Sequence, residues 1–356
     1  MSRPGDVERE WLTRKSRIDP KLDALGWRLR PEAPGGPFRS EEFETDAGPA
    51  DYVLHVGGHV VGVIEAKKLT VGPQNVLTQA ERYARGIRDS PYDFDGRRAP
   101  FLYSTNGEIV WFHDIRGPLS RSRRVADFHT PQALREMLDR EIEVAQERLL
   151  ATPNTRDRLR LYQRDANTAI ERAIADRHRR ILVAVATGTG KTFTLVNEVY
   201  RLMKAGVAKR VLFLVDRRAL AAQAVRAFSS FDAEPGLKFD KIYELYSSRF
   251  QTEDFGDDEP FDPKVLPNSY LTDPQPKHAF VYVSTIQRMA MNVLGRNAIF
   301  GLGDEPIDDE ADALIIPVHA FDVVIADECH RGYTAAEQSV RRSTLDRFDA
   351  IIVGRR

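Results

Sequence analysis

The chain has 356 residues, a formal net charge of −1 and a single cysteine, Cys329. This length allows two domains, each with its own hydrophobic core. One cysteine excludes a disulfide framework and a cysteine-rich zinc site. No apolar stretch is long enough to cross a bilayer, and the first residues lack the apolar segment of a secretion signal. These features predict a cytoplasmic protein.

Charge is spread unevenly along the chain. Eight arginines fall between Arg156 and Arg180 and four between Arg116 and Arg124, whereas acidic clusters occupy 253–262 and 304–312. Such runs form either solvated helix and loop faces or a face that contacts phosphate, and the sequence leaves both interpretations open.

Residues 1–150 have the pattern of a small α/β domain. Two β-rich runs flank Gly57-Gly58, which predicts a hairpin. The segment 151–154, with its proline and small polar residues, is the expected domain boundary. The other expected elements are a helix over 6–30, a helix over 75–88, two strands around the Asn106-Gly107 turn, and a helix over 131–150.

Residues 151–356 alternate continuous apolar runs with helical segments, which is typical of parallel βαβ units. The acidic, proline-rich stretch 251–278 has no periodicity and few apolar residues, so we expect an exposed insertion there. The expected buried strands are 181–185, 211–215, 280–283 and 323–325, which together suit a RecA-like sheet.

A candidate phosphate loop follows the first of these strands and precedes a helical segment. Its glycines let backbone N–H groups surround phosphate oxygens at a helix N-terminus. Lys191 would reach the terminal phosphates, and the Thr192 hydroxyl would bind Mg²⁺. Val185 stands where the strict pattern has glycine. The candidate ATP-binding residues are Thr187, Gly188, Thr189, Gly190, Lys191 and Thr192.

A pair of acids ends the apolar run 323–325, as expected for the second half of an ATP site. Asp327 would hold Mg²⁺, and Glu328 would orient or deprotonate the water that attacks the γ-phosphate. His330 would link this site to neighbouring motifs.

This Asp-Glu-x-His sequence, together with the loop Ala-Thr-Gly-Thr-Gly-Lys-Thr, resembles the superfamily 2 helicases and translocases. The resemblance implies that Gln163, which precedes the loop, reads the adenine edge. It also implies that Arg217, Thr285 and Gln287, which follow the second and third strands, contact the DNA backbone.

The first domain has a candidate nuclease site at Asp51, Glu65 and Lys67. Glu-x-Lys puts both polar side chains on one face of a strand. Two carboxylates can bind Mg²⁺, and a lysine beside the metal can position a hydroxide. A simple two-residue turn, however, would set Asp51 opposite Ile64 and leave the carboxylates on opposite faces. A bulge or bend near Asp51 is therefore required.

Gln79 and Tyr83 follow on a helix at positions i and i+4, so they share one face. The spacing of Asp51, Glu65 and Lys67 resembles the PD-(D/E)xK nuclease fold, although Ala50 replaces the proline. Together with the motor motifs that follow, this order resembles the restriction (R) subunit of type I restriction-modification enzymes. The resemblance implies that Gln79 and Tyr83 support the cutting site, that Arg82 contacts DNA phosphate, and that Glu8 or Glu10 adds a metal contact.

The expected fold is therefore α/β, with a PD-(D/E)xK nuclease-like domain followed by one RecA-like parallel-sheet motor domain. The resemblance implies Mg²⁺-dependent cleavage of double-stranded DNA coupled to ATP-driven translocation. It also implies two partners, a specificity subunit and a methylation subunit that binds S-adenosylmethionine. The motifs of a second motor half do not follow residues 349–356, so we expect a truncated chain with weak nucleotide binding and little ATPase activity.

Three rival interpretations stay open. In a type III restriction subunit the nuclease follows the motor, whereas here Asp51, Glu65 and Lys67 precede it. A non-cutting superfamily 2 remodeller would use its first domain only to bind DNA or RNA. A non-enzymatic remnant would have lost activity through truncation.

Overall fold

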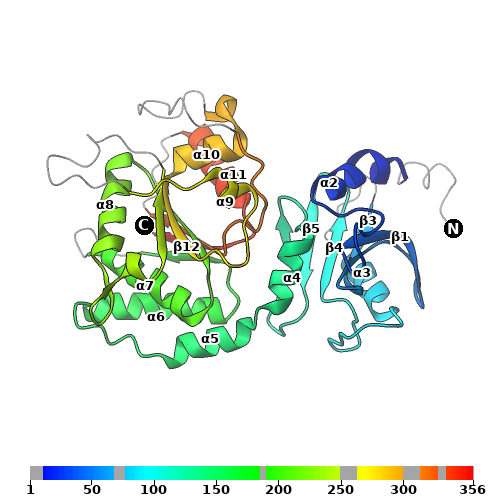
Figure 1. Ribbon diagram of the computed structural model, residues 1–356, viewed down its shortest axis with the longest axis horizontal. Helices are drawn as coiled ribbons and strands as arrows, with labels where there is room; N and C mark the ends of the chain where they lie inside the picture. Colours follow the sequence, from blue (N-terminus) through cyan, green and yellow to red (C-terminus); the bar gives the residue numbers. More distant parts are fainter. Residues whose placement is uncertain are drawn as a thin grey trace. The chain divides into compact units, whose positions relative to one another are not determined.

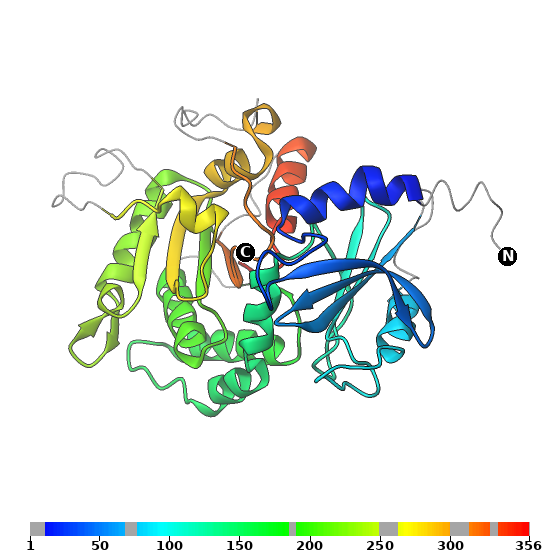
Figure 2. The same cartoon turned by 45° about the vertical axis from the view of Figure 1, so that its right-hand side comes forward.

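A computed structural model shows the chain as two compact units, Met1–Arg140 and Glu141–Arg356 (Figures 1 and 2). The division precedes the expected boundary at 151–154 because helix α5 (Ile142–Ala151) packs against the helices of the second unit. The structure describes residues 11–67, 77–184, 190–248, 263–299, 313–327 and 334–355.

The first unit is a six-stranded sheet with strand order β1-β2-β3-β4-β5-β6. Neighbouring strands are antiparallel except β3 and β4, which are parallel. Its strands are β1 (Phe38–Thr45), β2 (Gly48–Val56), β3 (His59–Ala66), β4 (Phe101–Thr105), β5 (Val110–Asp114) and β6 (Arg123–Val125). Its helices are the π-helical turn η1 (Arg14–Ile18), α2 (Asp19–Ala24), α3 (Leu77–Arg85) and α4 (Pro131–Asp139).

Helices cover both faces of this sheet because its strands are apolar on both sides. On one face, Ile18, Leu22 and Trp27 pack with alternate strand residues and with Leu134 of α4. On the other face, α3 covers a separate cluster that includes Val53 and Val63. The expected helix over 75–88 is confirmed for its described part. The expected single helix over 131–150 is wrong, because the chain breaks at Arg140 into α4 and α5.

The predicted hairpin around Gly57-Gly58 is confirmed, and both glycines have positive φ, as the tight turn requires. Pairing runs from Val56 with His59 to His55 with Val60 and then shifts, so that Leu54 pairs with Gly62. This bulge carries one extra residue in β3. It lies between the turn and Asp51 and so supplies the shift that the sequence requires.

The second unit is built on a six-stranded, all-parallel sheet with strand order β11-β12-β8-β13-β14-β7. The sheet strands are β7 (Arg180–Val183), β8 (Arg210–Val215), β11 (Glu244–Ser247), β12 (Phe280–Thr285), β13 (Val323–Asp327) and β14 (Ile351–Arg355). The helices are α5, α6 (Leu161–Ala175), α7 (Lys191–Ala205), α8 (Arg218–Ser230), α9 (Asn268–Thr272), α10 (Ile286–Leu294) and α11 (Ala335–Asp346). Short elements complete the unit: β9 (Asp232–Glu234), β10 (Leu237–Lys238), η3 (Phe239–Lys241) and η5 (Arg296–Ile299).

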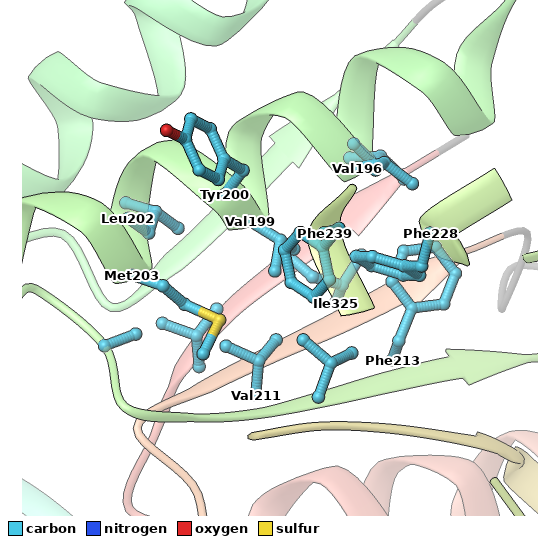
Figure 3. Packing of buried hydrophobic residues seen from close by; sticks show 14 of the residues in the cluster. Val196, Val199, Tyr200, Leu202, Met203, Val211, Phe213, Phe228, Phe239 and Ile325 are labelled. Atoms are coloured by element: carbon cyan, nitrogen blue, oxygen red, sulfur yellow. The ribbon is translucent and has the colours of Figure 1, made fainter. Parts of the chain in front are cut away.

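Apolar side chains fill both faces of this sheet, as expected for buried parallel strands. On one face, Val211, Phe213 and Ile325 pack under α7 and α8 (Figure 3). On the other, alternate strand residues pack with α9, α10 and residues 314–321. The expected buried strands at 211–215, 280–283 and 323–325 are confirmed. The strand expected at 181–185 forms as β7, but it lies at the edge of the sheet and is not buried, since Leu182 is 72% exposed, and residue 185 lies outside the described residues. The expectation that 251–278 is wholly exposed is wrong for its described part, because Leu266 and Leu271 are buried in this second cluster.

Candidate functional site

The bulge brings the first candidate site together. Beyond it, Val53 pairs with Val63 and Tyr52 with Ile64, so the next pair along the ladder is Asp51 and Glu65. Asp51 and Glu65 therefore lie beside each other on adjacent strands, at the end of the hairpin away from its turn. Helix α3 packs across β2, β3 and β4 and covers the cluster that contains Ala50, Val53 and Val63.

The carboxylate of Asp51 accepts hydrogen bonds from two donors. Its Oδ2 accepts a hydrogen bond from the backbone N–H of Ala66 at 2.7 Å. Its Oδ1 accepts one from Nη1 of Arg14 at 3.2 Å, and Nη2 of Arg14 donates to the backbone carbonyl of Asp51 at 3.2 Å. Two fixed donors leave this side chain little rotational freedom.

Glu65 and Lys67 form an ion pair, and Glu65 is 2% exposed. The backbone N–H of Lys67 donates to the backbone carbonyl of Thr105 at 2.7 Å, which ties the residue after β3 to the neighbouring strand β4. On α3, the amide of Gln79 donates to the hydroxyl of Tyr83 at 3.0 Å, as the shared helix face predicts.

Arg82 lies on the exposed side of α3, with its guanidinium 5.4 Å from the centre of the Tyr83 ring. A cation above an aromatic ring and open to solvent can contact a phosphate. Glu8 and Glu10 lie outside the described residues.

The two carboxylates suit Mg²⁺ better than a metal that needs a full protein cage. Asp51 and Glu65 supply hard oxygen ligands from adjacent strands. Among the residues that the structure describes, no group of three or more His, Cys, Asp or Glu side chains is placed to hold a metal ion. Magnesium commonly takes one or two carboxylates and completes its shell with water and substrate phosphate.

The second candidate site begins at Gly190, the residue before α7. Its φ of 73° is in the left-handed region, and a Cβ there would lie 2.9 Å from Nε2 of Gln163. The backbone conformation therefore favours glycine, and a larger residue would also displace the end of the Gln163 side chain. Lys191 and Thr192 form the first turn of α7, where the helix dipole is positive. Three residues predicted for this loop, Thr187, Gly188 and Thr189, lie outside the described residues.

Gln163 is buried at the start of α6 and reaches the same glycine. Its Nε2 donates to the carbonyl of Gly190 at 3.2 Å, and its Oε1 accepts from the backbone N–H of Arg160 at 2.9 Å. The structure thus brings the predicted adenine reader to the predicted phosphate loop.

Asp327 lies at the carboxyl end of β13 and is 8% exposed. In a parallel sheet all carboxyl ends share one edge, where α/β proteins bind ligands. Asp327 and Val183, which end β13 and β7, therefore lie at the same edge of the sheet, with β14 between their strands. Glu328 and His330 lie outside the described residues.

Two of the three predicted DNA contacts lie at that edge on adjacent strands. Arg217 follows β8, and its side chain is 62% exposed. Thr285 ends β12, and its hydroxyl accepts the backbone N–H of Arg288 at 3.2 Å, so this residue caps α10. Gln287 is half-buried in the first turn of α10. Their contact with DNA stays a prediction.

A polar seam, defined here by Asn167 and Glu171 of α6 and Thr194, Glu198 and Arg201 of α7, joins these two helices. Asn167 donates to the carbonyl of Thr194, and Arg201 forms a buried ion pair with Glu171. Burial, followed by the nearby charge of Glu171, raises the pKa of Glu198 well above its ordinary value.

His55 is a contrasting buried group in the first unit. Its ring stacks on Phe38 at 4.1 Å, and Nε2 lies 3.1 Å from Oγ of Ser40. Burial lowers the pKa of His55 to about 4.

The residue that sequence reasoning missed at the first site is Arg14. Neither the spacing of the acids nor the pattern of the hairpin points to the preceding helix. The only local signal is an arginine on the buried side of an amphipathic helix. Such a residue needs a buried partner, and Asp51 is the partner here.

These features define the class: a two-unit α/β protein with a paired-carboxylate site in a mixed sheet and a glycine-led helix N-terminus in a parallel sheet. Residues 156–354 match the family model described as "Type III restriction enzyme, res subunit". Residues 38–138 match "Type I restriction enzyme EcoKI endonuclease subunit second domain". The chain therefore belongs to the restriction-enzyme res-subunit family, and its resemblance to type I R subunits is confirmed.

The curated relatives are type I endonuclease subunits. The chain is 29% identical to the EcoKI endonuclease subunit of Escherichia coli strain K12, over 94% of this chain and 31% of that protein. It is 27% identical to the EcoAI endonuclease subunit of Escherichia coli, over 85% of this chain and 32% of that protein. The chain thus spans about a third of the length of these relatives.

Solved structures with a similar fold include a nuclease-deletion mutant of the Type ISP restriction-modification enzyme LlaGI with a DNA substrate mimic. That match has a TM-score of 0.34 and 21% identity and covers 56% of this chain and 17% of the other. The UvsW helicase from bacteriophage T4 matches with a TM-score of 0.33 and 16% identity, over 58% of this chain and 55% of the other. Within the described residues, no helix has the length and apolar character needed to span a membrane.

Proposed function

We propose that the chain is the front portion of a type I restriction R subunit, in which unit 1 cuts double-stranded DNA and unit 2 is the first half of an ATP-driven motor. The observation that supports this most is the bulge in β3, which sets Asp51 and Glu65 opposite each other beside Lys67. A strand face that served only solubility would not need this shift in register.

In this proposal, Asp51 and Glu65 hold Mg²⁺ in a PD-(D/E)xK-like arrangement. When bound, the metal supplies positive charge to a phosphate oxygen and lowers the pKa of a water. Lys67, fixed by its pairing with Glu65, orients the attacking water and offsets charge on the phosphate. Gln79 and Tyr83 support the site from α3, and Arg82 contacts a DNA phosphate.

In unit 2, the proposed ATP site is RecA-like. Backbone N–H groups of residues 187–190 and Lys191 bind phosphates, Thr192 and Asp327 bind Mg²⁺, and Gln163 reads adenine. Glu328 orients the attacking water, and His330 links the site to neighbouring motifs. Arg217, Thr285 and Gln287 face the DNA backbone.

The same family implies partners for the whole protein. We propose that it works in the cytoplasm in a complex with a specificity subunit and with a methylation subunit that binds S-adenosylmethionine. The alternative from another class is a superfamily 2 remodeller whose first unit binds DNA without cutting it.

Nicking of supercoiled plasmid separates these two proposals. The purified chain is expected to nick in Mg²⁺ and not in EDTA, and Asp51→Ala and Lys67→Ala are each expected to reduce nicking at least about 100-fold. Asp46→Ala is the matched control, because Asp46 is an exposed aspartate of the same unit that pairs with the exposed Arg88. Undiminished cutting by both site variants would remove the assignment, and DNA binding without cutting would favour the remodeller.

A further inference from the structure

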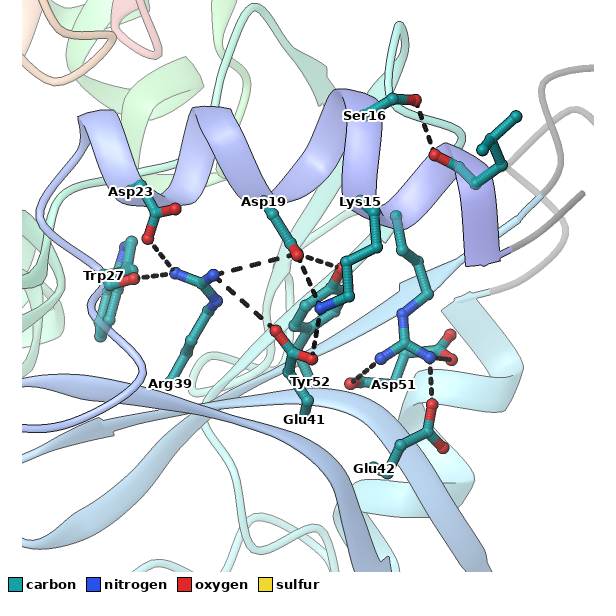
Figure 4. A network of polar contacts seen from close by, with 12 residues as sticks. Lys15, Ser16, Asp19, Asp23, Trp27, Arg39, Glu41, Glu42, Asp51 and Tyr52 are labelled. Carbon is teal, nitrogen blue, oxygen red and sulfur yellow. Dashed lines mark hydrogen bonds and ion pairs between the residues drawn. The ribbon is translucent and has the colours of Figure 1, made fainter. Parts of the chain in front are cut away.

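The contact between Arg14 and Asp51 indicates a role for Arg14 at the proposed metal site. This role rests on the nuclease function proposed above. Arg14 belongs to η1 and therefore comes from outside the hairpin that carries the two acids. Two of its nitrogens donate hydrogen bonds to Asp51, one to the carboxylate and one to the backbone carbonyl, each at 3.2 Å (Figure 4). A two-point contact fixes both the side chain and the backbone of Asp51.

Arg14 is itself firmly placed. Its side chain is 8% exposed and forms a second ion pair with Glu42 of β1. Its guanidinium carbon lies 4.8 Å from the centre of the Tyr52 ring. Burial lowers the pKa of Arg14, but hydrogen bonds to Glu42 and Tyr52 and the charge of Asp51 outweigh it, so the group stays charged.

The helix that carries Arg14 is anchored to the sheet by a separate polar network. Lys15 binds Asp19 at 2.9 Å and Glu41 of β1 at 2.7 Å. The hydroxyl of Tyr52 donates to Asp19 at 2.6 Å. Because these contacts tie η1 and α2 to β1 and β2, Arg14 reaches Asp51 from a rigid support.

The backbone opposite Asp51 carries a local distortion. Glu42 lies between Glu41 and Phe43, which pair with Tyr52 and Ala50, and its φ is 48°. A non-glycine residue in the left-handed region is unfavourable and persists only where its surroundings impose it. The Arg14–Glu42 ion pair lies at this point of β1.

We propose that Arg14 is a positioning residue for metal binding: it fixes the carboxylate of Asp51 so that its remaining lone pairs face a Mg²⁺ ion shared with Glu65. Ala66 fixes the other carboxylate oxygen at 2.7 Å, so the two donors together set the plane of the group. Donors that orient a ligand in this way typically change metal affinity 10–100-fold.

The alternative is that Arg14 weakens metal binding, and the test must distinguish this from the proposed strengthening. A positive charge beside a carboxylate can also repel a metal ion, in which case removing Arg14 would tighten metal binding. A purely structural arginine would leave metal affinity unchanged in a variant that stays folded.

The experiment measures Mn²⁺ binding to the nucleotide-free chain by electron paramagnetic resonance, for the wild type and for four variants. Asp51→Asn defines the signal from other sites, which is subtracted. Arg14→Gln is expected to weaken binding at the Asp51 site by about 10-fold or more. Arg14→Lys keeps the charge but cannot make the two-point contact, so an intermediate loss is expected. Arg17→Gln is the matched control, since Arg17 lies on the same helix and pairs with the exposed Glu108, and less than about a 2-fold change is expected.

Unchanged or tighter binding in Arg14→Gln, with Arg14→Lys like the wild type, would overturn the inference. If Arg14→Gln does not fold by circular dichroism, Arg14→Lys decides alone, and wild-type affinity in that variant refutes the positioning role. A failure of the proposed function looks different: Asp51→Asn would then bind Mn²⁺ as well as the wild type does.

Discussion

The two units fix their candidate sites by different means. In unit 1, side chains do this: Arg14 holds Asp51, Lys67 pairs with Glu65, and Gln79 bonds to Tyr83 on α3. In unit 2, backbone conformation fixes the site, through the left-handed Gly190 at the start of α7 and through the aligned ends of parallel strands.

This difference predicts how each site responds to mutation. A site held by side chains loses its geometry when one distant partner is replaced. A site held by backbone geometry tolerates changes around it and fails only where a group touches the ligand or where glycine is required. Four changes test or sharpen this contrast.

The largest effect is expected in the polar seam of unit 2, where stability does depend on side-chain pairing. Arg201→Met would leave Glu171 buried without its cation and would remove donors from the backbone carbonyls of Thr152 and Pro153. Loss of one partner of a buried ion pair costs about 3–5 kcal/mol. Urea unfolding, with hydrogen exchange to localise the change to α6 and α7, measures it. Arg180→Met, which breaks an exposed pair with Asp346, should cost less than about 1 kcal/mol.

Lys191→Ala should weaken ATP binding about 100-fold, or about 2.7 kcal/mol, because in the proposed ATP site this lysine contacts the terminal phosphates. Isothermal titration with a non-hydrolysable ATP analogue measures this. Lys204→Ala, on the same helix but paired with Glu234, should bind like the wild type. Mn²⁺ binding at Asp51 should not change in either variant, and a parallel loss there would contradict two independently built sites.

Acid should destabilise unit 1 through His55. Its folded pKa of about 4 lies below the ordinary 6.5, so this contribution is complete above pH 6.5 and is lost as pH falls towards 4. After allowance for partial solvent access, the loss is about 2 kcal/mol. Hydrogen exchange of β1 and β2 at pH 7.5 and pH 4.5 would show it. His55→Gln should flatten this dependence, and an equally steep slope in the variant would assign it to other groups.

Through Glu198, the stability of unit 2 should change with pH in the opposite direction. This effect should be the smallest of the four. Its folded pKa is raised, so the stability it contributes is present below the ordinary 4.5 and is lost as pH rises through the raised folded value. Glu198→Gln should gain on the order of 1 kcal/mol at pH 8 and little at pH 4, because the fully buried side chain no longer has to take up a proton on folding or be buried as a charge. Urea midpoints at both pH values measure the difference. A loss of stability at pH 8 would show that the carboxylate is needed.

The contrast also explains what the sequence could predict. The unit 2 motifs are contiguous in sequence and follow buried strands, so Gly190, Lys191 and Asp327 could be placed at one sheet edge from the pattern alone. The hairpin of unit 1 and the Gln79–Tyr83 pair were predictable for the same local reasons. The sequence indicated that a bulge was needed, because a regular hairpin would set Asp51 opposite Ile64. The position of the register shift, between Leu54 and His55, could not be predicted.

Contacts between segments that are far apart in the sequence could not be predicted from the sequence pattern. Arg14 of η1 contacts Asp51 of β2, and no periodicity in the sequence indicates that these two segments pack together. Strands β1 and β11 were not predicted, because β1 is half polar and β11 is short. The break at Arg140 was missed because helical composition continues on both sides of it.

The place of β14 in the sheet has a consequence for how the chain is made. β14 lies between β7 and β13, pairing Gly354 with Leu182 and Ala326, yet it is translated long after β7. At typical synthesis rates of 5–20 residues per second, β7 and its phosphate loop wait about 10–30 s for this neighbour. Unit 1 has no such dependence, because each of its strands pairs with the next one in the chain. On the ribosome, the sheet of unit 1 can therefore close while the sheet of unit 2 still lacks its last strand.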